Sequence, residues 1–120
     1  MPIVDVQVVV EAGKAAPEGA AKALANTLAQ VLQTEPGRVW VRLEQLAAEN
    51  YAENGEGERV LPVFVKVLHA DLPPTAALAA QALAMAQAVA ACLSRNSGQV
   101  HIEYAPPGRG RVAFGGKLLR

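Results

Sequence analysis

The stretch Pro2-Ile3-Val4-Asp5-Val6-Gln7-Val8-Val9-Val10 decides the fold, because valines alternate with polar residues in it as in a half-buried β-strand. The same pattern returns in the second half of the chain. There Val65-Lys66-Val67-Leu68-His69 lies over Val4-Asp5-Val6-Gln7-Val8 without a gap. Since the apolar phase is kept, the chain is expected to contain two copies of one structural unit.

The repeat continues at the same offset through a helical stretch, a second strand and a Gly-containing turn. Apolar residues spaced by three and four put one set on a single helix face in each half. The aligned sets are Leu24, Leu28, Val31 and Leu32 over Met85, Val89, Cys92 and Leu93, then 38–43 over 99–104, then 51–55 over 112–116. The pattern predicts one domain, residues 1–120, built from β-α-β pseudo-repeats at 2–59 and 62–120.

Turn signals mark the ends of these elements. Pro17 suits the first turn of the first helix, and Pro73 and Pro74 precede the second helix. The segment 47–59 joins the halves, and its Asn54-Gly55 pair is typical of a tight turn.

The predicted class is α+β, because each unit places a helix between two strands. Those strands should be parallel with a right-handed crossover, and two units then give a four-stranded mixed sheet with both helices on one face. The face away from the helices is expected to carry Asp5, Gln7, Trp40, Arg42, Lys66, His101 and Glu103. It is either solvated or packed against other subunits. We favour packing, because aromatic and Arg residues are enriched in buried interfaces.

Composition narrows the function classes. Eleven basic and eleven acidic residues balance, so no net field would attract nucleic acid or an anionic membrane. The single cysteine, Cys92, excludes an internal disulfide and fits a reducing, cytoplasmic setting. We expect no signal peptide, and no apolar run approaching the roughly 18 residues of a membrane span.

Pro2 has two interpretations. If Met1 is removed, Pro2 becomes a free secondary amine, a base that no internal residue offers. The simpler interpretation is a rigid residue at the first position of a strand, where a missing N–H is harmless.

These features together resemble the tautomerase superfamily. The resemblance rests on Pro2, on the duplicated β-α-β unit, on Gly110-Arg111-Val112-Ala113-Phe114-Gly115-Gly116, and on the second-unit opening Leu61-Pro62-Val63-Phe64-Val65. Short members such as 4-oxalocrotonate tautomerase correspond to one half. Long members such as macrophage migration inhibitory factor and cis-3-chloroacrylic acid dehalogenase carry both halves. The resemblance implies a homotrimer whose active sites are lined by more than one subunit.

The family's catalytic base maps directly onto Pro2. An α-amino group ordinarily titrates near 8, and burial or nearby cations would lower its pKa. The neutral amine could then take a proton next to a carbonyl and return it elsewhere. The second half has Val63 at the matching position, so the resemblance implies one working site per chain and three per trimer.

The family's carboxylate-binding arginines are not kept. The first falls near Ala12, where Lys14 is the closest cation, and the second falls on Trp40 and His101 in the two halves. Arg42 could supply charge from a shifted place. Together with Arg111 near the predicted site mouth, the tentative substrate-binding set is Lys14, Trp40, Arg42, His101 and Arg111.

Dehalogenase chemistry is not expected. The arginine pair of the dehalogenases falls around Ala70 and Pro73, and their water-activating Glu matches Ala113. Two histidines without a Cys or carboxylate cluster argue against a metal site, and no phosphate loop or dinucleotide fingerprint is present.

Several candidates also have structural interpretations. His101 is either a second proton-transfer or anion-binding residue or a hydrogen-bonded interface histidine. His69 and Asp71 are predicted to be structural, and Cys92 to belong to the core. Glu103 is predicted to form an ion pair with Arg42 across the sheet.

The leading hypothesis is a cofactor-independent keto–enol tautomerase that acts on a small 2-oxo or 2-hydroxy-alkenoate acid. Its partners would be that carboxylate substrate and two further copies of itself, without nucleic acid or membrane. One alternative is a non-catalytic trimeric binding protein on the same fold. Another is a decarboxylase or lyase that uses the same amine, by way of a Schiff base.

Overall fold

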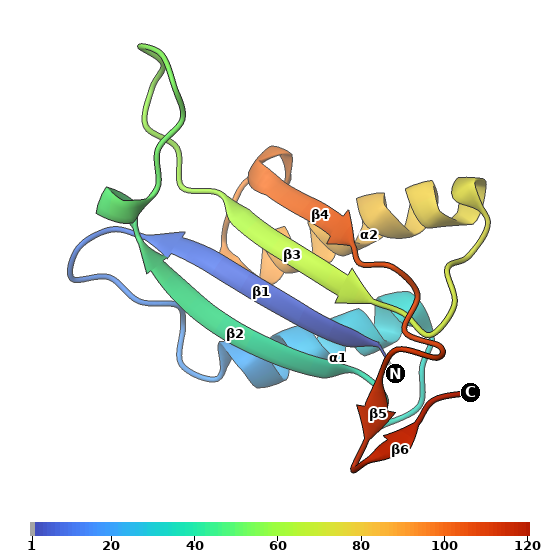
Figure 1. Ribbon diagram of the computed structural model, residues 1–120. Coiled ribbons are helices and arrows are strands. Elements are labelled where there is room, and N and C mark those ends of the chain that lie inside the picture. Colours follow the sequence, from blue (N-terminus) through green and yellow to red (C-terminus); the bar gives the residue numbers. More distant parts are fainter. Residues whose placement is uncertain (1) are drawn as a thin grey trace.

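A computed structural model describes residues 2–120 of the chain, so Met1 and the question of its removal lie outside the described residues (Figure 1). The elements are β1 Ile3–Val10, α1 Ala20–Leu32, β2 Trp40–Ala47, a short 3-10 turn Ala48–Asn50, β3 Val63–Leu68, α2 Thr75–Leu93, a second 3-10 turn Ser97–Gln99, β4 Val100–Tyr104, β5 Ala113–Phe114 and β6 Lys117–Leu118.

The first four strands form one sheet in the order β2-β1-β3-β4. β1 is parallel to β2, with Ile3 opposite Trp40, and β3 is parallel to β4. The two units meet along β1 and β3, which are antiparallel, with Ile3 opposite Leu68. This arrangement confirms the predicted mixed sheet of two β-α-β units. It also relates the units by an approximate two-fold axis between the central strands.

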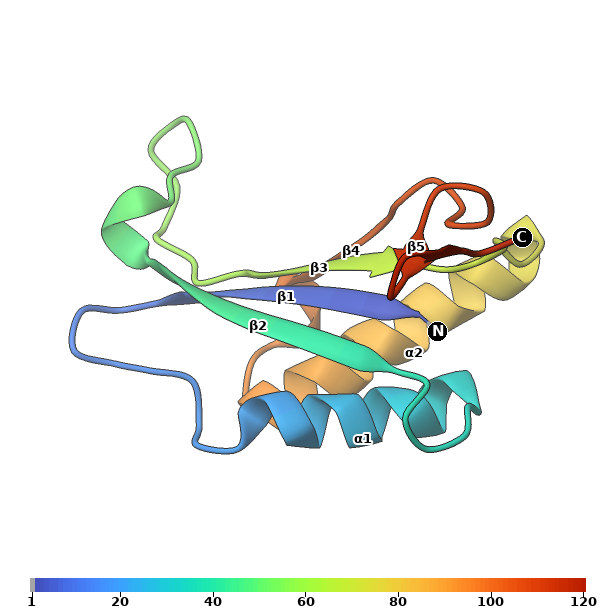
Figure 2. The ribbon, with the colours of Figure 1, turned by 60° about the horizontal axis from the view of Figure 1, so that its bottom comes forward.

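Both helices cover one face of the sheet, as predicted (Figure 2). α1 and α2 each end at a residue in the left-handed conformation, Gln33 with φ 52° and Ser94 with φ 54°. Pro74 immediately precedes α2. Pro17 lies before α1 rather than in its first turn, because α1 begins only at Ala20, whose N–H donates to the Pro17 carbonyl at 3.1 Å.

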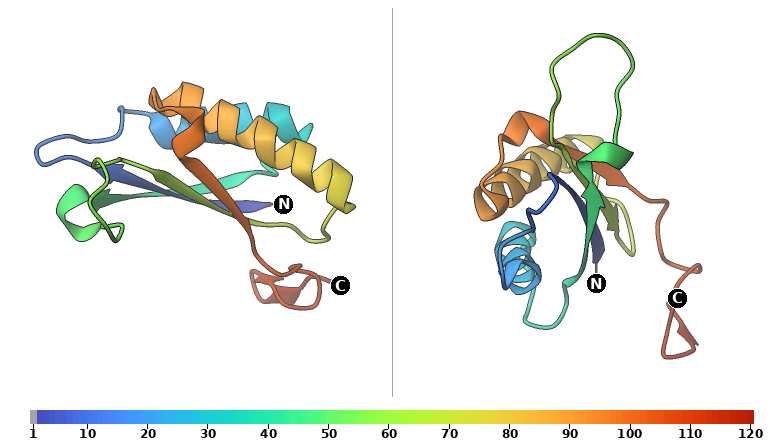
Figure 3. Two further views of the ribbon diagram at one scale, coloured as in Figure 1. Left: turned by 90° about the horizontal axis from the view of Figure 1, so that it is seen from above. Right: turned by 90° about the vertical axis from the view of Figure 1, so that its left-hand side faces the viewer.

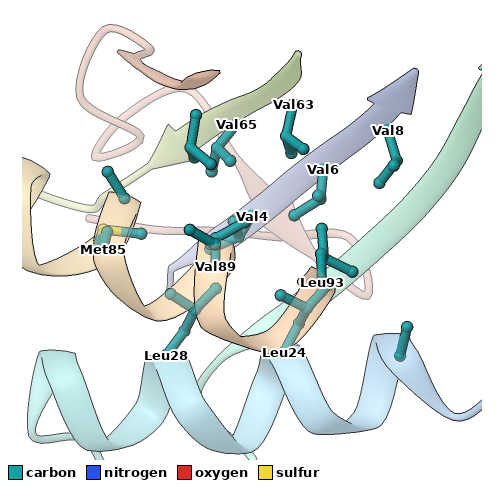
Figure 4. Close-up of a cluster of buried hydrophobic side chains, with 14 of the residues drawn as sticks. Val4, Val6, Val8, Leu24, Leu28, Val63, Val65, Met85, Val89 and Leu93 are labelled. Atoms are coloured by element: carbon teal, nitrogen blue, oxygen red, sulfur yellow. The ribbon is translucent and has the colours of Figure 1, made fainter. Parts of the chain in front are cut away.

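The core lies between the sheet and the helices (Figure 4). Its side chains come from alternate positions of β1 and β3 and from one face of each helix. Those that are fully buried include Val4, Val6, Val63, Val67, Leu24, Leu28, Met85 and Val89. Burying one such side chain contributes about 1.5–3 kcal/mol relative to leaving it in water. The strand alternation therefore sets which sheet face meets the helices.

Helix α2 corrects one expectation. It has 19 residues and a mean hydropathy of 1.7, and by length and composition alone it could cross a membrane. The expectation that no apolar run approaches that length is therefore wrong. Alanines make the outer face apolar as well, and Leu83 on that face is 62% exposed. The inner face packs on the sheet through Met85 and Val89, and a core helix of a globular domain passes the same test.

Two segments extend away from the sheet at its opposite ends. The β5–β6 hairpin lies on the side of the sheet away from the helices (Figure 3). Its turn residues Gly115 and Gly116 have φ of 57° and 86°, the left-handed conformation that favours glycine. The loop 51–60 projects at the other end and forms no strand, although 51–55 aligns with the hairpin in sequence. Gly55 turns this loop with φ 100°.

Candidate active site

Pro2 lies at the start of the central strand β1, and less than 2% of its side chain is exposed. It continues the burial alternation of β1, so it belongs to the helix side of the sheet together with Val4 and Val6. Its carbonyl accepts the backbone N–H of Trp40 at 3.1 Å. Continuing the β1–β3 register by one residue sets Pro2 opposite His69. Both neighbouring strands therefore determine where Pro2 lies.

An aromatic pair stands next to Pro2 on the open side of the sheet. The rings of Trp40 and Phe114 meet edge to face, with centroids 5.4 Å apart and an interplanar angle of 88°. Trp40 also donates its indole N–H to the Gly37 carbonyl at 3.0 Å, yet its side chain is 53% exposed. The C-terminal hairpin is thus held against the residue that is hydrogen-bonded to Pro2.

A polar cluster occupies the helix side of the same sheet end. His69 and Tyr104 stack with ring centroids 5.8 Å apart, and both bond to the side-chain oxygen of Gln81 on α2, at 2.7 Å and 2.9 Å. An amide oxygen only accepts, so both residues donate to it and His69 does so through Nε2. Burial raises the pKa of the Tyr104 hydroxyl above its usual value near 10.

No site role for this cluster is predicted from the sequence. His69 was predicted to be structural, and its bond to Gln81 agrees with that prediction. Tyr104 and Gln81 were not singled out. A helix-facing Tyr at a strand end, aligned with a polar residue on the facing helix, is a signal that could have identified them.

Arg109 is the guanidinium nearest in the chain to this cluster. It binds Asp71 with two hydrogen bonds of 2.8 Å and 2.6 Å and also donates to the carbonyl of Arg120. The hydrogen bonds lower the pKa of Asp71 and raise the pKa of Arg109. Asp71 is thus structural, as predicted. Arg111 follows in the exposed turn, where its backbone N–H donates to the Gly108 carbonyl at 2.8 Å.

Arg42 and His101 lie elsewhere, on the open face of the sheet. There they line a hollow of about 830 Å³. Arg42 binds Asp5 with bonds of 2.5 Å and 2.9 Å, and His101 packs against Phe64 at a centroid distance of 5.6 Å. Pro2 is not among the lining residues of this hollow.

The predicted Arg42–Glu103 ion pair is wrong within the chain. Arg42 lies on β2 and Glu103 on β4, which are the two edge strands of the sheet. Asp5 is directly opposite Arg42 on the adjacent strand and forms the ion pair with it instead. Cross-strand neighbours rather than sequence offset decide such pairs.

Lys14 lies at the opposite end of β1 from Pro2, in the loop between β1 and α1. A single chain therefore brings only Trp40, of the five tentative binding residues, into direct contact with Pro2. Within residues 2–120 no group of three or more His, Cys, Asp and Glu side chains is placed to hold a metal ion.

Comparison with known proteins adds the fold family. None of the protein-family models and none of the curated proteins searched matches the sequence. Solved structures do match, over nearly the whole chain. The Q0 fused 4-OT, a wild-type symmetric trimer, superposes with a TM-score of 0.76 and 21% identity, covering 97% of this chain and 94% of that chain.

Two further structures carry inhibitors. Pt0534 inactivated by 2-oxo-3-pentynoate gives a TM-score of 0.74 at 13% identity, covering 97% of this chain and 94% of that chain. FG41 malonate semialdehyde decarboxylase inhibited by 3-bromopropiolate gives 0.71 at 14% identity, covering 94% and 88%. The chain therefore has the fold of the tautomerase superfamily.

Proposed function

We propose that this protein is a cofactor-independent keto–enol tautomerase whose base is the N-terminal amine of Pro2. The observation that carries the proposal is the complete burial of Pro2 at the start of β1, beside an aromatic pair, in a fold shared with structures inhibited by small unsaturated carboxylates. The substrate class is a small 2-oxo or 2-hydroxy-alkenoate acid. The single Cys92 suits work in a reducing cytoplasm.

The chemistry requires removal of Met1 and an uncharged amine. Apolar surroundings disfavour the ammonium form and would therefore lower the pKa of this amine from its ordinary value near 8. The neutral nitrogen takes the proton from the 2-hydroxyl of the enol, and the ammonium so formed returns a proton to the alkene carbon. The products are the 2-oxo acid and the free amine, so no redox partner is needed.

We propose that three copies assemble through their open sheet faces. The fused 4-OT with this fold is a symmetric trimer, and the open face of this chain carries a polar hollow of about 830 Å³. Assembly would bring Arg42 and His101 of that face close to residues of the neighbouring chains.

A decarboxylase is the second candidate, favoured by the likeness to malonate semialdehyde decarboxylase. In that reaction the carboxylate leaves as carbon dioxide and a proton takes its place. A non-catalytic binding trimer is the third, since Ala12, Trp40 and His101 stand at the positions where the resemblance implies carboxylate-binding arginines.

The deciding experiment combines intact mass with kinetics. The purified protein should lack Met1, and 2-hydroxymuconate and the enol of phenylpyruvate should be converted to their 2-oxo forms. Pro2→Ala should lower kcat about 10²–10⁴-fold, the range for loss of a general base. Pro36→Ala, in an exposed loop, is the matched control.

Three results separate the candidates. Carbon dioxide release from malonate semialdehyde, with no enol conversion, would favour the decarboxylase. Labelling of Pro2 by reductive trapping with a keto acid would indicate a Schiff base. Equal rates for Pro2→Ala and the parent would contradict the proposal that Pro2 is the base.

A further inference from the structure

A second cavity lies at the far end of the sheet from Pro2. It has a volume of about 490 Å³ and opens between the loop that follows β1 and the C-terminal end of α2. Figure 2 shows this loop arching away from the sheet between β1 and α1. The apolar walls come from Val8, Val10, Leu61 and Leu93, and the loop contributes Glu11, Lys14 and Ala15–Pro17. This volume lies within the range of about 300–1,000 Å³ that is typical of small-molecule pockets.

Arg95 places a fixed positive charge in the wall of this cavity. Its two terminal nitrogens donate to the carbonyls of Leu61 and Val9, at 2.7 Å and 2.9 Å. Neutral carbonyls hold the guanidinium in place without cancelling its charge, and no salt bridge of Arg95 exists among residues 2–120. The geometry leaves the charge of Arg95 available to an anion.

Lys14 adds a second positive charge, and Glu11 the only negative one, among the lining residues. The Lys14 N–H donates to the Glu11 carbonyl at 2.9 Å, which closes the loop into a turn. No Lys14–Glu11 ion pair forms between the side chains within the described part of the chain. The net charge of the lining is therefore +1, which matches a monoanion with an apolar body.

The internal repeat explains why a cavity is found here. The two-fold relation between the units carries the start of β1 onto the start of β3, and hence Pro2 onto Val63. The same offset carries Thr34 onto Arg95. This end of the sheet is therefore the counterpart of the Pro2 end, with a cation added and the terminal amine absent. The length of β1 separates the two ends by about 23 Å, at about 3.3 Å per residue.

We propose that this cavity is a second ligand site, which binds a small monocarboxylate with an apolar body and does not convert it. Arg95 and Lys14 bind the carboxylate, and Val8, Val10 and Leu93 contact the apolar part. The lining contains no terminal amine like the one proposed as the base at the Pro2 end, so the site acts in binding only. This site is independent of the chemistry proposed for Pro2.

The test is an NMR titration of the full-length protein with phenylacetate. The amide signals of Lys14, Ala16 and Arg95 should shift and saturate as phenylacetate is added. The amide signals of Trp40 and Phe114 report separately on any binding at the Pro2 end. Phenylacetamide, the neutral analogue, should bind at least about tenfold more weakly, because it lacks the charge that Arg95 and Lys14 recognise.

Two variants locate the binding. Ala16→Leu fills the cavity from its loop wall and should abolish the saturable shifts at Arg95. Lys14→Gln should raise the Kd about three- to tenfold, as for loss of one partly exposed charged contact. Lys22→Gln, on the exposed face of α1, is the matched control and should leave the Kd unchanged.

The proposal is overturned if phenylacetate causes no saturable shift at Lys14, Ala16 and Arg95, if Ala16→Leu binds like the parent, or if phenylacetamide binds equally well. Pro2→Ala should bind at this cavity as the parent does. Loss of turnover and loss of this binding are therefore distinguishable.

Discussion

Trp40 donates its backbone N–H to the carbonyl of Pro2 at 3.1 Å, so the first residue of β2 lies directly beside the proposed base. The indole of Trp40 in turn meets Phe114 of the C-terminal hairpin at 5.4 Å. One parallel strand pair and one aromatic contact thus connect the two termini of the chain. This connection makes the N-terminal end of β1 sensitive to changes in a hairpin more than 100 residues away in sequence.

Phe114→Ala should expose the indole of Trp40 and loosen the Pro2 end. An edge-to-face pair contributes about 0.5–1.5 kcal/mol beyond its buried area. Trp40 is the only tryptophan, so its fluorescence maximum should move to longer wavelength. Phe64→Ala is the matched control, because Phe64 contacts Tyr51 and His101 instead. Equal shifts in both variants would contradict this arrangement.

Tyr104→Phe should cost about 1 kcal/mol of unfolding free energy in urea, since Gln81 loses one of its two donors. The variant should also change how folding stability depends on pH in alkaline solution. Burial raises the pKa of Tyr104 in the folded protein. The contribution of Tyr104 to folding stability is therefore fully present below its unfolded pKa near 10 and is lost as the pH rises through the folded pKa.

This pH dependence has its own control. The parent should lose stability above about pH 10, where unfolded tyrosine ionises, and Tyr104→Phe should lose less. Tyr51 also has a raised pKa, caused first by its hydrogen bond to Glu53, so Tyr51→Phe is measured in parallel. If absorbance at tyrosinate wavelengths shows both tyrosines titrating as free phenols, the account of Tyr104 fails.

Asp71→Asn should loosen the segment that leads into the hairpin, because Arg109 loses its paired carboxylate. Hydrogen exchange should accelerate at the Gly110 and Leu119 amides, which bond to Leu119 and Val112 carbonyls. The folded pKa of Asp71 is lowered. The contribution of Asp71 to folding stability is therefore present above its unfolded pKa of about 3.9 and is lost as the pH falls through its folded pKa.

The control for this pair is Asp5→Asn. Asp5 binds Arg42 with a similar two-bond contact on the open face, between β1 and β2 rather than in the segment that leads into the hairpin. The Asp5→Asn variant should leave hydrogen exchange in the hairpin unchanged. Faster exchange at Gly110 in Asp5→Asn would show that the effect is general loosening rather than release of Arg109.

The assembly is tested by sedimentation. A chain of 12.5 kDa should sediment as a species three times as heavy. Lys66→Glu, on the open face, should weaken the trimer, whereas Lys22→Glu, on the exposed side of α1, should not. A monomer at micromolar concentration, or equal weakening by both variants, would exclude association through the open face.

Much of the fold could be predicted because strand alternation and helix spacing are local properties. The valines of β1 and β3 identify the buried face without knowledge of their partners. The site could be predicted less well. Arg42 was paired with the wrong carboxylate, because a carboxylate at the directly opposite register position, Asp5, decides that bond. The expectation about apolar runs was wrong for a different reason, because the many alanines of α2 make its outer face apolar as well.

The sequence alone determined the doubled unit, the two sheet faces and the position of Pro2 at the start of the first strand. These follow from apolar periodicity, which reflects burial residue by residue. Only the tertiary structure decided that Lys14 lies at the opposite end from Pro2, that His69 and Tyr104 share Gln81, and that Arg95 is held by two carbonyls. Polar side chains find their partners across elements distant in sequence, so their neighbours depend on strand order and packing rather than on local pattern.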